Sequence, residues 1–377
     1  MKFIFKSIIN YIKETDKLLI LLCICASTYS VVLLSGLENS DMLASPRQII
    51  VQAGAAVVGL IAAVILSKID YKTMAKLWKL HSVIAYGLVI LTFFLGIRVS
   101  DFVDDRAWLQ LPFNMTLQPS ELLKISFIIT FSYHLEKVGN RLNNFKYLIG
   151  VLLHAIVPIG LIMKQGDHGT ALIFAFICLC MLFSAGLSWK YIIPAGMLGI
   201  CSIPILWNII GEDKQMRIMT VFNPMLDPQG IGWQQNMGML SIGSGQIWGK
   251  GIFYGNHHYV SEIYNDFIFA FIGEALGYVG CMSVIILLSA IVLKILLTAA
   301  KSRDFLGKYI CVGVFAMFAF QILLNIGMCI STLPVIGVTL PFFSAGGTSV
   351  VSSYLGIGLA LSVYTHNNEK GIFGEKL

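Results

Sequence analysis

The sequence is poor in charged residues. Of its 377 residues, 12% are Asp, Glu, Lys or Arg and 57% are hydrophobic. Soluble domains contain roughly twice that share of charge, so the chain lacks the polar surface that a soluble core of this size requires. The apolar residues come in long blocks, and runs of about 20 are typical of transmembrane helices. We therefore predict an all-α polytopic membrane protein, one domain over residues 1–377, with no soluble domain attached.

Cysteine chemistry is not indicated either. All eight cysteines fall inside the apolar blocks, where they are typical of small buried apolar residues rather than of disulfides or metal ligands. A cleavable signal peptide is also not expected. The first 17 residues are polar and basic, and no small-residue cleavage site follows the first apolar block. We expect that block to remain as a membrane anchor.

The apolar blocks predict about ten membrane-spanning helices. They lie near 17–36, 47–67, 77–97, 119–135, 145–163, 168–187, 190–210, 265–298, 307–331 and 346–365. The eighth is too long for one perpendicular crossing, so we expect it to tilt or to project beyond the bilayer.

Positive charge predicts the orientation of these helices. About eighteen Lys and Arg residues fall in one set of connections and both tails, against seven in the opposite set. Basic residues gather on the cytoplasmic side of membrane proteins, so we expect a multi-pass protein of the cytoplasmic membrane with both termini cytoplasmic. The net charge of +6 then reflects orientation, and no nucleic-acid partner is indicated.

Three outward segments stand out. The first, 98–118, contains Asp101, Asp104 and Asp105. The second, 211–265, is a long extracytoplasmic loop between the seventh and eighth helices. Its apolar content predicts folding on the outer bilayer surface, partly as short amphipathic helices. The third, 331–348, is broken by proline and glycine yet is not polar, which is typical of a re-entrant loop.

Asp266 is the first candidate for chemistry, because it stands where the polar loop meets the eighth helix. One interpretation is a first-turn acid that complements the helix dipole, with Asn265 or Ser261 as the cap. The other is a general base at the outer surface, whose pKa burial or the neighbouring Glu262 would raise.

Glu121 and Lys124 are the second candidate. Their spacing places both on one helix face, and an ammonium inside an apolar span needs a partner or a wet cavity. We favour a functional cavity, with a packing ion pair as the alternative.

Two further groups are weaker. Lys164 and Asp167 lie in KQGDHGTALIF, which alone is typical of a turn and helix cap. Arg217 is suited to bind a phosphate, although an interfacial arginine more often contacts lipid headgroups. Residues 249–251 do not complete a P-loop, and the adjacent His257 and His258 are interpreted as plain loop residues, not as a metal site.

The order of these segments resembles the SEDS family of RodA, FtsW and SpoVE, and RodA most. The resemblance runs from the fourth helix to the end of the chain through LQPSELLKI, KQGDHGTALI, NPMLDPQGIGWQQNMGMLSIGSGQIWGKG, YNDFIFAFIGEALGYVG and LPVIGVTLPFFSAGGTS. It matches the proposed catalytic aspartate to Asp266 and also matches Glu274. It implies a substrate-binding role for Glu121, Lys124, Lys164, Asp167, Arg217, Lys250 and Glu274. Tyr264 replaces the histidine that often precedes this aspartate, which argues against a histidine-assisted base.

The resemblance implies a membrane glycosyltransferase that polymerises lipid II, an undecaprenyl-pyrophosphate disaccharide-pentapeptide, into peptidoglycan. Asp266 would take the acceptor proton, and cations would offset the departing pyrophosphate. Lys124 and Arg217 are the first candidates for that role, followed by Lys164 and Lys250. No cofactor is evident, and a divalent cation, Mg²⁺ or Mn²⁺, is a possible contributor.

The implied partners are lipid II, membrane lipids and a class B penicillin-binding protein. The alternatives are a lipid-linked precursor flippase, which requires a polar route across the membrane, and a scaffold without chemistry. Elongation, division and sporulation all stay open, with the short tails favouring elongation.

Overall fold

The computed structural model describes residues 14–39, 46–97, 106–112, 115–223, 226–227, 230–253 and 256–368. Asp101, Asp104 and Asp105 of the first outward segment lie outside these ranges.

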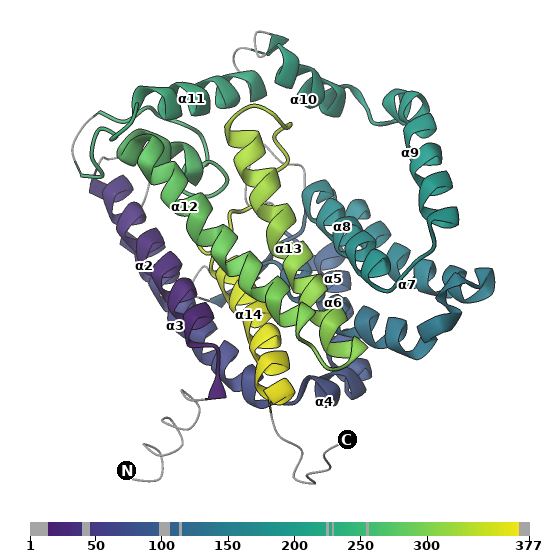
Figure 1. Cartoon of the computed structure of the whole chain (residues 1–377). Coiled ribbons are helices and arrows are strands. Elements are labelled where there is room, and N and C mark those ends of the chain that lie inside the picture. Colours follow the sequence, from purple (N-terminus) through teal and green to yellow (C-terminus); the bar gives the residue numbers. More distant parts are fainter. Residues whose placement is uncertain are drawn as a thin grey trace, which may run out of the picture.

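The described residues form a bundle of long helices (Figure 1). In chain order the elements are α2 (Lys17–Asn39), α3 (Pro46–Lys68), α4 (Tyr71–Lys76), α5 (Trp78–Leu95), β1 (Leu109–Leu111), β2 (Met115–Leu117), α6 (Pro119–Val138), η2 (Gly139–Asn143), α7 (Phe145–Lys164), α8 (His168–Ser184), α9 (Trp189–Ile209), α10 (Glu212–Phe222), α11 (Ile231–Ser244), α12 (Ile268–Ala300), α13 (Phe305–Cys329) and α14 (Gly347–Asn368). The two short strands pair antiparallel, with Leu109 opposite Leu117.

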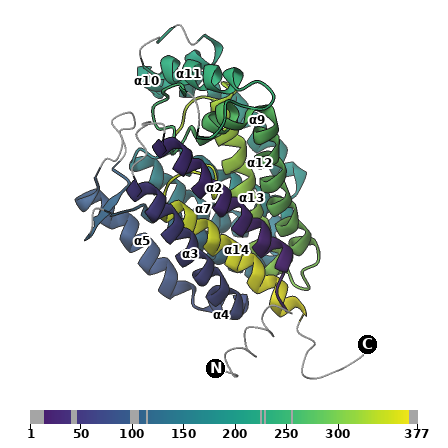
Figure 2. The same cartoon turned by 90° about the vertical axis from the view of Figure 1, so that its left-hand side faces the viewer.

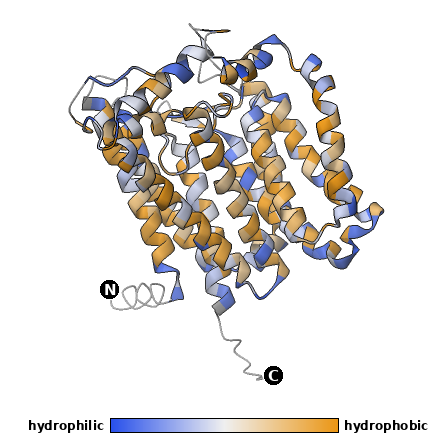
Figure 3. Cartoon of the chain, turned by 45° about the horizontal axis from the view of Figure 1, so that its top comes forward, coloured by the Kyte–Doolittle hydropathy of each residue, from blue (hydrophilic) through white to orange (hydrophobic). Residues whose placement is uncertain are grey.

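Each predicted span coincides with one helix. Among the described residues, seven helices (α2, α3, α5, α7, α12, α13 and α14) are long and apolar enough to cross a membrane, and α8 and α9 are apolar but shorter. The protein is therefore a multi-pass membrane protein, as predicted. That α6, α8 and α9 also cross stays a prediction. Hydrophobic residues dominate the long helices (Figure 3). Many large apolar side chains are exposed, which suits a hydrocarbon solvent.

Helix ends follow local chemistry. Asp167 Oδ1 accepts a hydrogen bond from Thr170 N at 2.9 Å at the start of α8, and Asp304 Oδ1 accepts one from Gly307 N at 2.8 Å at the start of α13. Pro119 occupies the first turn of α6, where its missing N–H costs no helical hydrogen bond. These caps fix where the polar turns begin.

Small residues let the central helices approach closely. Gly59 of α3 leaves room for the ring of Tyr354 on α14, and Gly358 of α14 packs on the backbone of Ala63. Tyr354 is completely buried. α14 and α3 therefore form a tight pair within the bundle.

The two ends of the bundle differ. At the lower end in Figure 1, Asp304 accepts hydrogen bonds from Tyr71 Oη at 2.7 Å and from Lys72 Nζ at 2.8 Å, and Asn367 Nδ2 donates to Lys301 O at 2.6 Å. At the upper end, α10 and α11 lie across the bundle (Figure 2). The long loop thus contains two short helices, and their place on the outer bilayer surface stays a prediction.

α12 differs from the predicted eighth span. It starts at Ile268 rather than near 265, and its backbone is non-helical at Gly277, with φ +65°. This break divides the long span into two shorter pieces, whereas we expected one long helix that tilts or projects beyond the bilayer. The short piece of α12 before the break, 268–276, lies at the upper end, next to α11.

Candidate functional site

The site is organised around the non-helical stretch between α13 and α14. We call residues 331–346 the central segment. Most of its second half is buried, including Phe342, Phe343 and Ser344. Ser331 and Phe342 have positive φ values of 53° and 67°, an unfavourable backbone conformation that surrounding contacts must hold. The break that proline and glycine predicted is present. That the segment re-enters the bilayer stays a prediction.

Hydrogen bonds attach the central segment to helices on several sides. Gln52 of α3 donates to the carbonyl oxygens of Phe342 and Ser344, each at 3.2 Å. Asn325 of α13 donates to Val338 O at 2.7 Å. These buried amides satisfy carbonyls that a helix or sheet would otherwise pair.

Asp266 lies on a turn, 261–267, that rests on the central segment. Ser344 Oγ donates to Asn265 O at 2.6 Å, and Ala345 N donates to Tyr264 O at 2.8 Å. Asn325 Nδ2 donates to Asp266 O at 2.8 Å, so one amide joins this turn to Val338. These contacts hold the backbone of the turn against the central segment and α13, and Asp266 itself is partly exposed.

The interpretation of Asp266 as a first-turn acid, with Asn265 or Ser261 as the cap, is wrong. α12 begins after Asp266, and its cap position is Phe267, with no side-chain hydrogen bond. Asn265 Nδ2 instead donates to Glu262 Oε2 at 3.0 Å within the turn. Asp266 is therefore not a first-turn acid inside the helix.

Glu121 and Lys124 form a buried ion pair. Lys124 Nζ lies 2.7 Å from Glu121 Oε1, and the two side chains are 0% and 6% exposed. Ser352 Oγ of α14 donates to Glu121 O at 3.1 Å. Because the Lys124 ammonium is enclosed and paired with Glu121, the structure favours a structural role for Lys124. It does not favour the expected contact of Lys124 with a pyrophosphate.

Asp167 joins the same group. Gln118 Nε2 donates to Asp167 Oδ2 at 2.9 Å, and Lys124 and Glu121 are close enough to act on it electrostatically. Burial raises the pKa of Asp167, although the Thr170 amide works in the opposite direction. The structure thus brings Asp167, Glu121 and Lys124 together.

Arg217 contacts the first half of the central segment. Its Nη1 donates to Val335 O at 3.1 Å. Arg217 and Lys214, both on α10, act electrostatically on His168 at the start of α8. Gly169 lies so close to Ile336 O that a Cβ would come within 2.6 Å of it. This side of the site is positively charged.

Lys164 is separate from these contacts. It is exposed, and its ammonium lies 5.9 Å from the centre of the Phe93 ring on α5. Lys164 therefore contacts an aromatic face on α5, away from the groups that surround the central segment.

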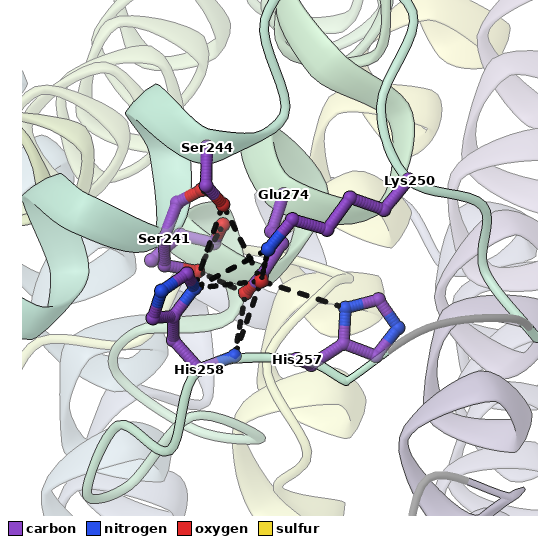
Figure 4. A network of polar contacts seen from close by, with 7 residues as sticks. Ser241, Ser244, Lys250, His257, His258 and Glu274 are labelled. Atoms are coloured by element: carbon purple, nitrogen blue, oxygen red, sulfur yellow. Dashed lines mark hydrogen bonds and ion pairs between the residues drawn. The ribbon is translucent and has the colours of Figure 1, made fainter.

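Glu274 is buried in a polar network rather than exposed to a substrate (Figure 4). Its side chain is 0% exposed, and Lys250 Nζ lies 2.5 Å from its Oε1. His258 Nδ1 lies 2.8 Å from the same oxygen, and Ser241 Oγ donates to Oε2 at 2.8 Å. The interpretation of His257 and His258 as plain loop residues is wrong, because both imidazoles face this carboxylate.

Sequence patterns did not identify Gln118, Asn325 or Gln52 as site residues. Each is a buried or half-buried amide at a helix start or inside an apolar helix, and polar side chains in such positions are a recognised signal of function. For a metal, no group of three or more His, Cys, Asp or Glu side chains over the described ranges is arranged to hold one.

Comparison with known proteins gives a consistent result. A family model for cell cycle proteins of the FtsW, RodA and SpoVE type matches residues 14–369. The chain is 30% identical over 362 residues to peptidoglycan glycosyltransferase MrdB of Escherichia coli, covering 93% of this chain and 94% of that one. It is 29% identical over 365 residues to a probable peptidoglycan glycosyltransferase FtsW of Trichlorobacter lovleyi, covering 93% of each.

Solved structures share the fold. A chain of a peptidoglycan synthase complex that coordinates polymerization and crosslinking superposes with a TM-score of 0.80 at 23% identity, covering 94% of this chain and 99% of that one. The rod shape determining protein RodA of Thermus thermophilus superposes with a TM-score of 0.69 at 21% identity, covering 94% and 98%. At these identities the likeness shows the fold.

Proposed function

The chain belongs to the FtsW/RodA/SpoVE family, and from that premise we propose that it is a peptidoglycan glycosyltransferase that polymerises lipid II. Relatives that match it over 93% of its length are named for this activity. The observation that supports the proposal best is the central segment, which holds the Asp266 turn on one side and contacts Arg217 on another.

Asp266 is the proposed base. Both substrates of such a reaction are anchored in lipid, so their sugars meet at a membrane surface. Asp266 takes the proton of the acceptor hydroxyl, and the hydroxyl oxygen attacks the anomeric carbon of the growing chain. The new glycosidic bond forms as the bond to the diphosphate breaks, with inversion, and the lipid diphosphate leaves.

Arg217 and Lys214 are the proposed receivers of the diphosphate. Lys124 is already paired with Glu121, and Lys250 with Glu274. Arg217 and Lys214 lie on α10 beside the central segment, where Arg217 Nη1 donates to Val335 O at 3.1 Å, and a guanidinium at this place is suited to stabilise phosphate oxygens as negative charge develops. Mg²⁺ or Mn²⁺ would enter such a reaction with the diphosphate of the substrate and would help to offset its charge.

The orientation and partner belong to the same proposal. With the basic residues of the lower end in the cytoplasm, both termini are cytoplasmic and Asp266 faces outward from the bacterial cytoplasmic membrane. A class B penicillin-binding protein is the proposed partner, because a solved relative is part of a complex that polymerises and crosslinks.

A lipid-precursor flippase is the alternative that one observation favours. Lower in the bundle, His154 lies 3.2 Å from Thr130 Oγ1 and 3.1 Å from His134, and His81 lies 2.8 Å from Ser126 Oγ. These are polar contacts inside the helical region. They are also adequate as interhelical hydrogen bonds, so they do not outweigh the arrangement at the upper end.

Purified protein in proteoliposomes with fluorescent lipid II separates the candidates. The proposal predicts glycan polymer on gels without any partner enzyme. Movement of labelled lipid between leaflets without polymer would instead establish the flippase. If folded protein shows neither polymer formation nor lipid movement, the scaffold is the remaining candidate and the proposal is overturned.

A further inference from the structure

The break in α12 interrupts its backbone hydrogen bonds at one place. An intact helix would pair Tyr278 N with Glu274 O and Val279 N with Ala275 O. Gly277, with φ +65° and ψ −161°, separates these groups. Buried donors and acceptors at such a break must find other partners.

The loop 245–251 supplies all four partners. Gln246 O accepts from Tyr278 N at 2.8 Å, and Ile247 O accepts from Val279 N at 3.2 Å. In return Lys250 N donates to Glu274 O and Gly251 N donates to Ala275 O, each at 2.9 Å. The loop is therefore inserted into the helix break through its backbone.

Glycines permit this close approach. A Cβ on Gly245 would collide with Gly273 O, and a Cβ on Gly249 would collide with the backbone of Ala275. Gly277 has no room either, since its Cβ would come within 2.5 Å of Ile247 O and Gly249 N. The loop and the helix fit together only with these small residues.

Side chains lock the inserted loop. Glu274, on the last turn before the break, is bound by Lys250 of the loop at 2.5 Å. His258 binds it through its backbone N at 3.0 Å and its Nδ1 at 2.8 Å, and Ser241 Oγ of α11 donates at 2.8 Å. Breaking one partner of such a buried pair leaves a charge uncompensated and is costly. Figure 4 shows these groups converging on one carboxylate.

His257 adds no positive charge to this carboxylate. Its imidazole lies 3.9 Å from Glu274 Oε1 and packs edge-on to Phe271, with ring centroids 5.1 Å apart. Burial lowers its pKa, so the ring is neutral near pH 7. Lys250 supplies a positive charge to Glu274 that His257 does not.

The locked piece of α12 leads directly to Asp266. The turn 261–267 ends where α12 starts, and α11 holds both, because Gln234 Nε2 donates to Ser261 O at 3.0 Å and Ser241 Oγ donates to Glu274 Oε2 at 2.8 Å. The central segment fixes the turn from the other side. Displacing the 268–276 piece would therefore displace Asp266.

We propose that Glu274 and Lys250, with His258, are positioning residues that clamp the first part of α12 and so hold Asp266 in place. This inference rests on the proposed function. It changes the expected roles of Lys250 and Glu274, which would act on Asp266 through the helix and would not contact lipid II.

Kinetics of lipid II polymerisation test the clamp. Glu274→Gln and Lys250→Met should each lower kcat about tenfold or more, since small misplacements of a reacting group are costly, while KM for lipid II stays within about twofold. The double variant should be no worse than the poorer single variant, because both residues serve one unit. Lys250→Arg should recover most of the rate.

The matched control is an ion pair that involves the other end of α12. Lys294 Nζ pairs with Asp16 Oδ2 at 2.6 Å, and Lys294→Met and Asp16→Asn should leave kcat and KM close to wild type. Raised KM at unchanged kcat would show direct substrate contact and overturn the clamp. Should Glu274→Gln not fold, Ser241→Ala removes a single hydrogen bond to Glu274 and must still lower kcat at constant KM.

A second measurement needs no catalytic activity. Asp266→Cys is labelled with a maleimide, and mass spectrometry of its peptide gives the labelling rate. Adding Glu274→Gln should change that rate by about threefold or more, whereas adding Lys294→Met should not. An unchanged rate would overturn the clamp, while absence of polymer from the wild-type protein would overturn only the proposed function.

Discussion

At the residue scale, the position of each cation decides which of them we propose as a contact of the diphosphate. Lys124 and Lys250 each neutralise a buried carboxylate, and Lys164 lies against an aromatic ring. Arg217 is partly exposed, contacts the central segment through a neutral oxygen and has Lys214 on the same helix. We therefore propose α10, which carries two basic side chains beside the central segment, for the electrostatic part of the reaction.

Replacing Arg217 with Met should lower the polymerisation rate by about a hundredfold, the usual effect of removing one donor that meets developing negative charge. Arg141→Met is the matched control. Arg141 also donates to a backbone carbonyl, Lys137 O at 3.1 Å, but at the lower end of the bundle. Initial rates with labelled lipid II measure both, and equal rates for the two variants would exclude this role for Arg217.

Sequence spacing predicted residue contacts only where they are local. Glu121 and Lys124 are three apart on a helix, so their common face could be predicted. Lys250 and Glu274 come together only because a loop is inserted into a helix break, which no periodicity indicates. The same reason explains why the contacts of His257 and His258 with Glu274 were missed.

At the element scale, two interruptions of helical structure build the site. The central segment interrupts the path from α13 to α14, and Gly277 interrupts α12. Proline and glycine predicted the first interruption. The second lay inside an apolar block whose composition continues unchanged through Gly277, so length and hydropathy could indicate only that the block was too long.

Gly277→Ala should disrupt the upper part of α12. The backbone of Gly277, with φ +65° and ψ −161°, lies in a region that essentially only glycine occupies, so a side chain there costs about 1–3 kcal/mol, and the new Cβ would press on the inserted loop. We expect a lower melting temperature and little polymerisation. Gly160→Ala in α7 is the control, because no atom lies within 4 Å of its Cβ position; its melting temperature should hold or rise. A Gly277→Ala protein as stable and active as wild type would contradict the account of the break.

At the scale of the whole molecule, the bundle brings segments distant in sequence to one end. The long loop, the start of α12 and the stretch before α14 meet at the upper end in Figure 1, while the basic connections gather at the lower end. Apolar blocks and the distribution of positive charge predicted this division of the chain. The central claim that follows is that one carboxylate at the upper end, Asp266, is the base of a polymerase.

The most direct measurement is the initial rate of lipid II polymerisation by purified Asp266→Asn at saturating substrate. The amide preserves size but cannot accept the proton, so the rate should fall by about a hundredfold or more, with lipid II binding kept within about threefold. Glu136→Gln, the same change of group at an exposed position on α6, should keep the wild-type rate. An Asp266→Asn protein that polymerises lipid II within tenfold of wild type would contradict the account.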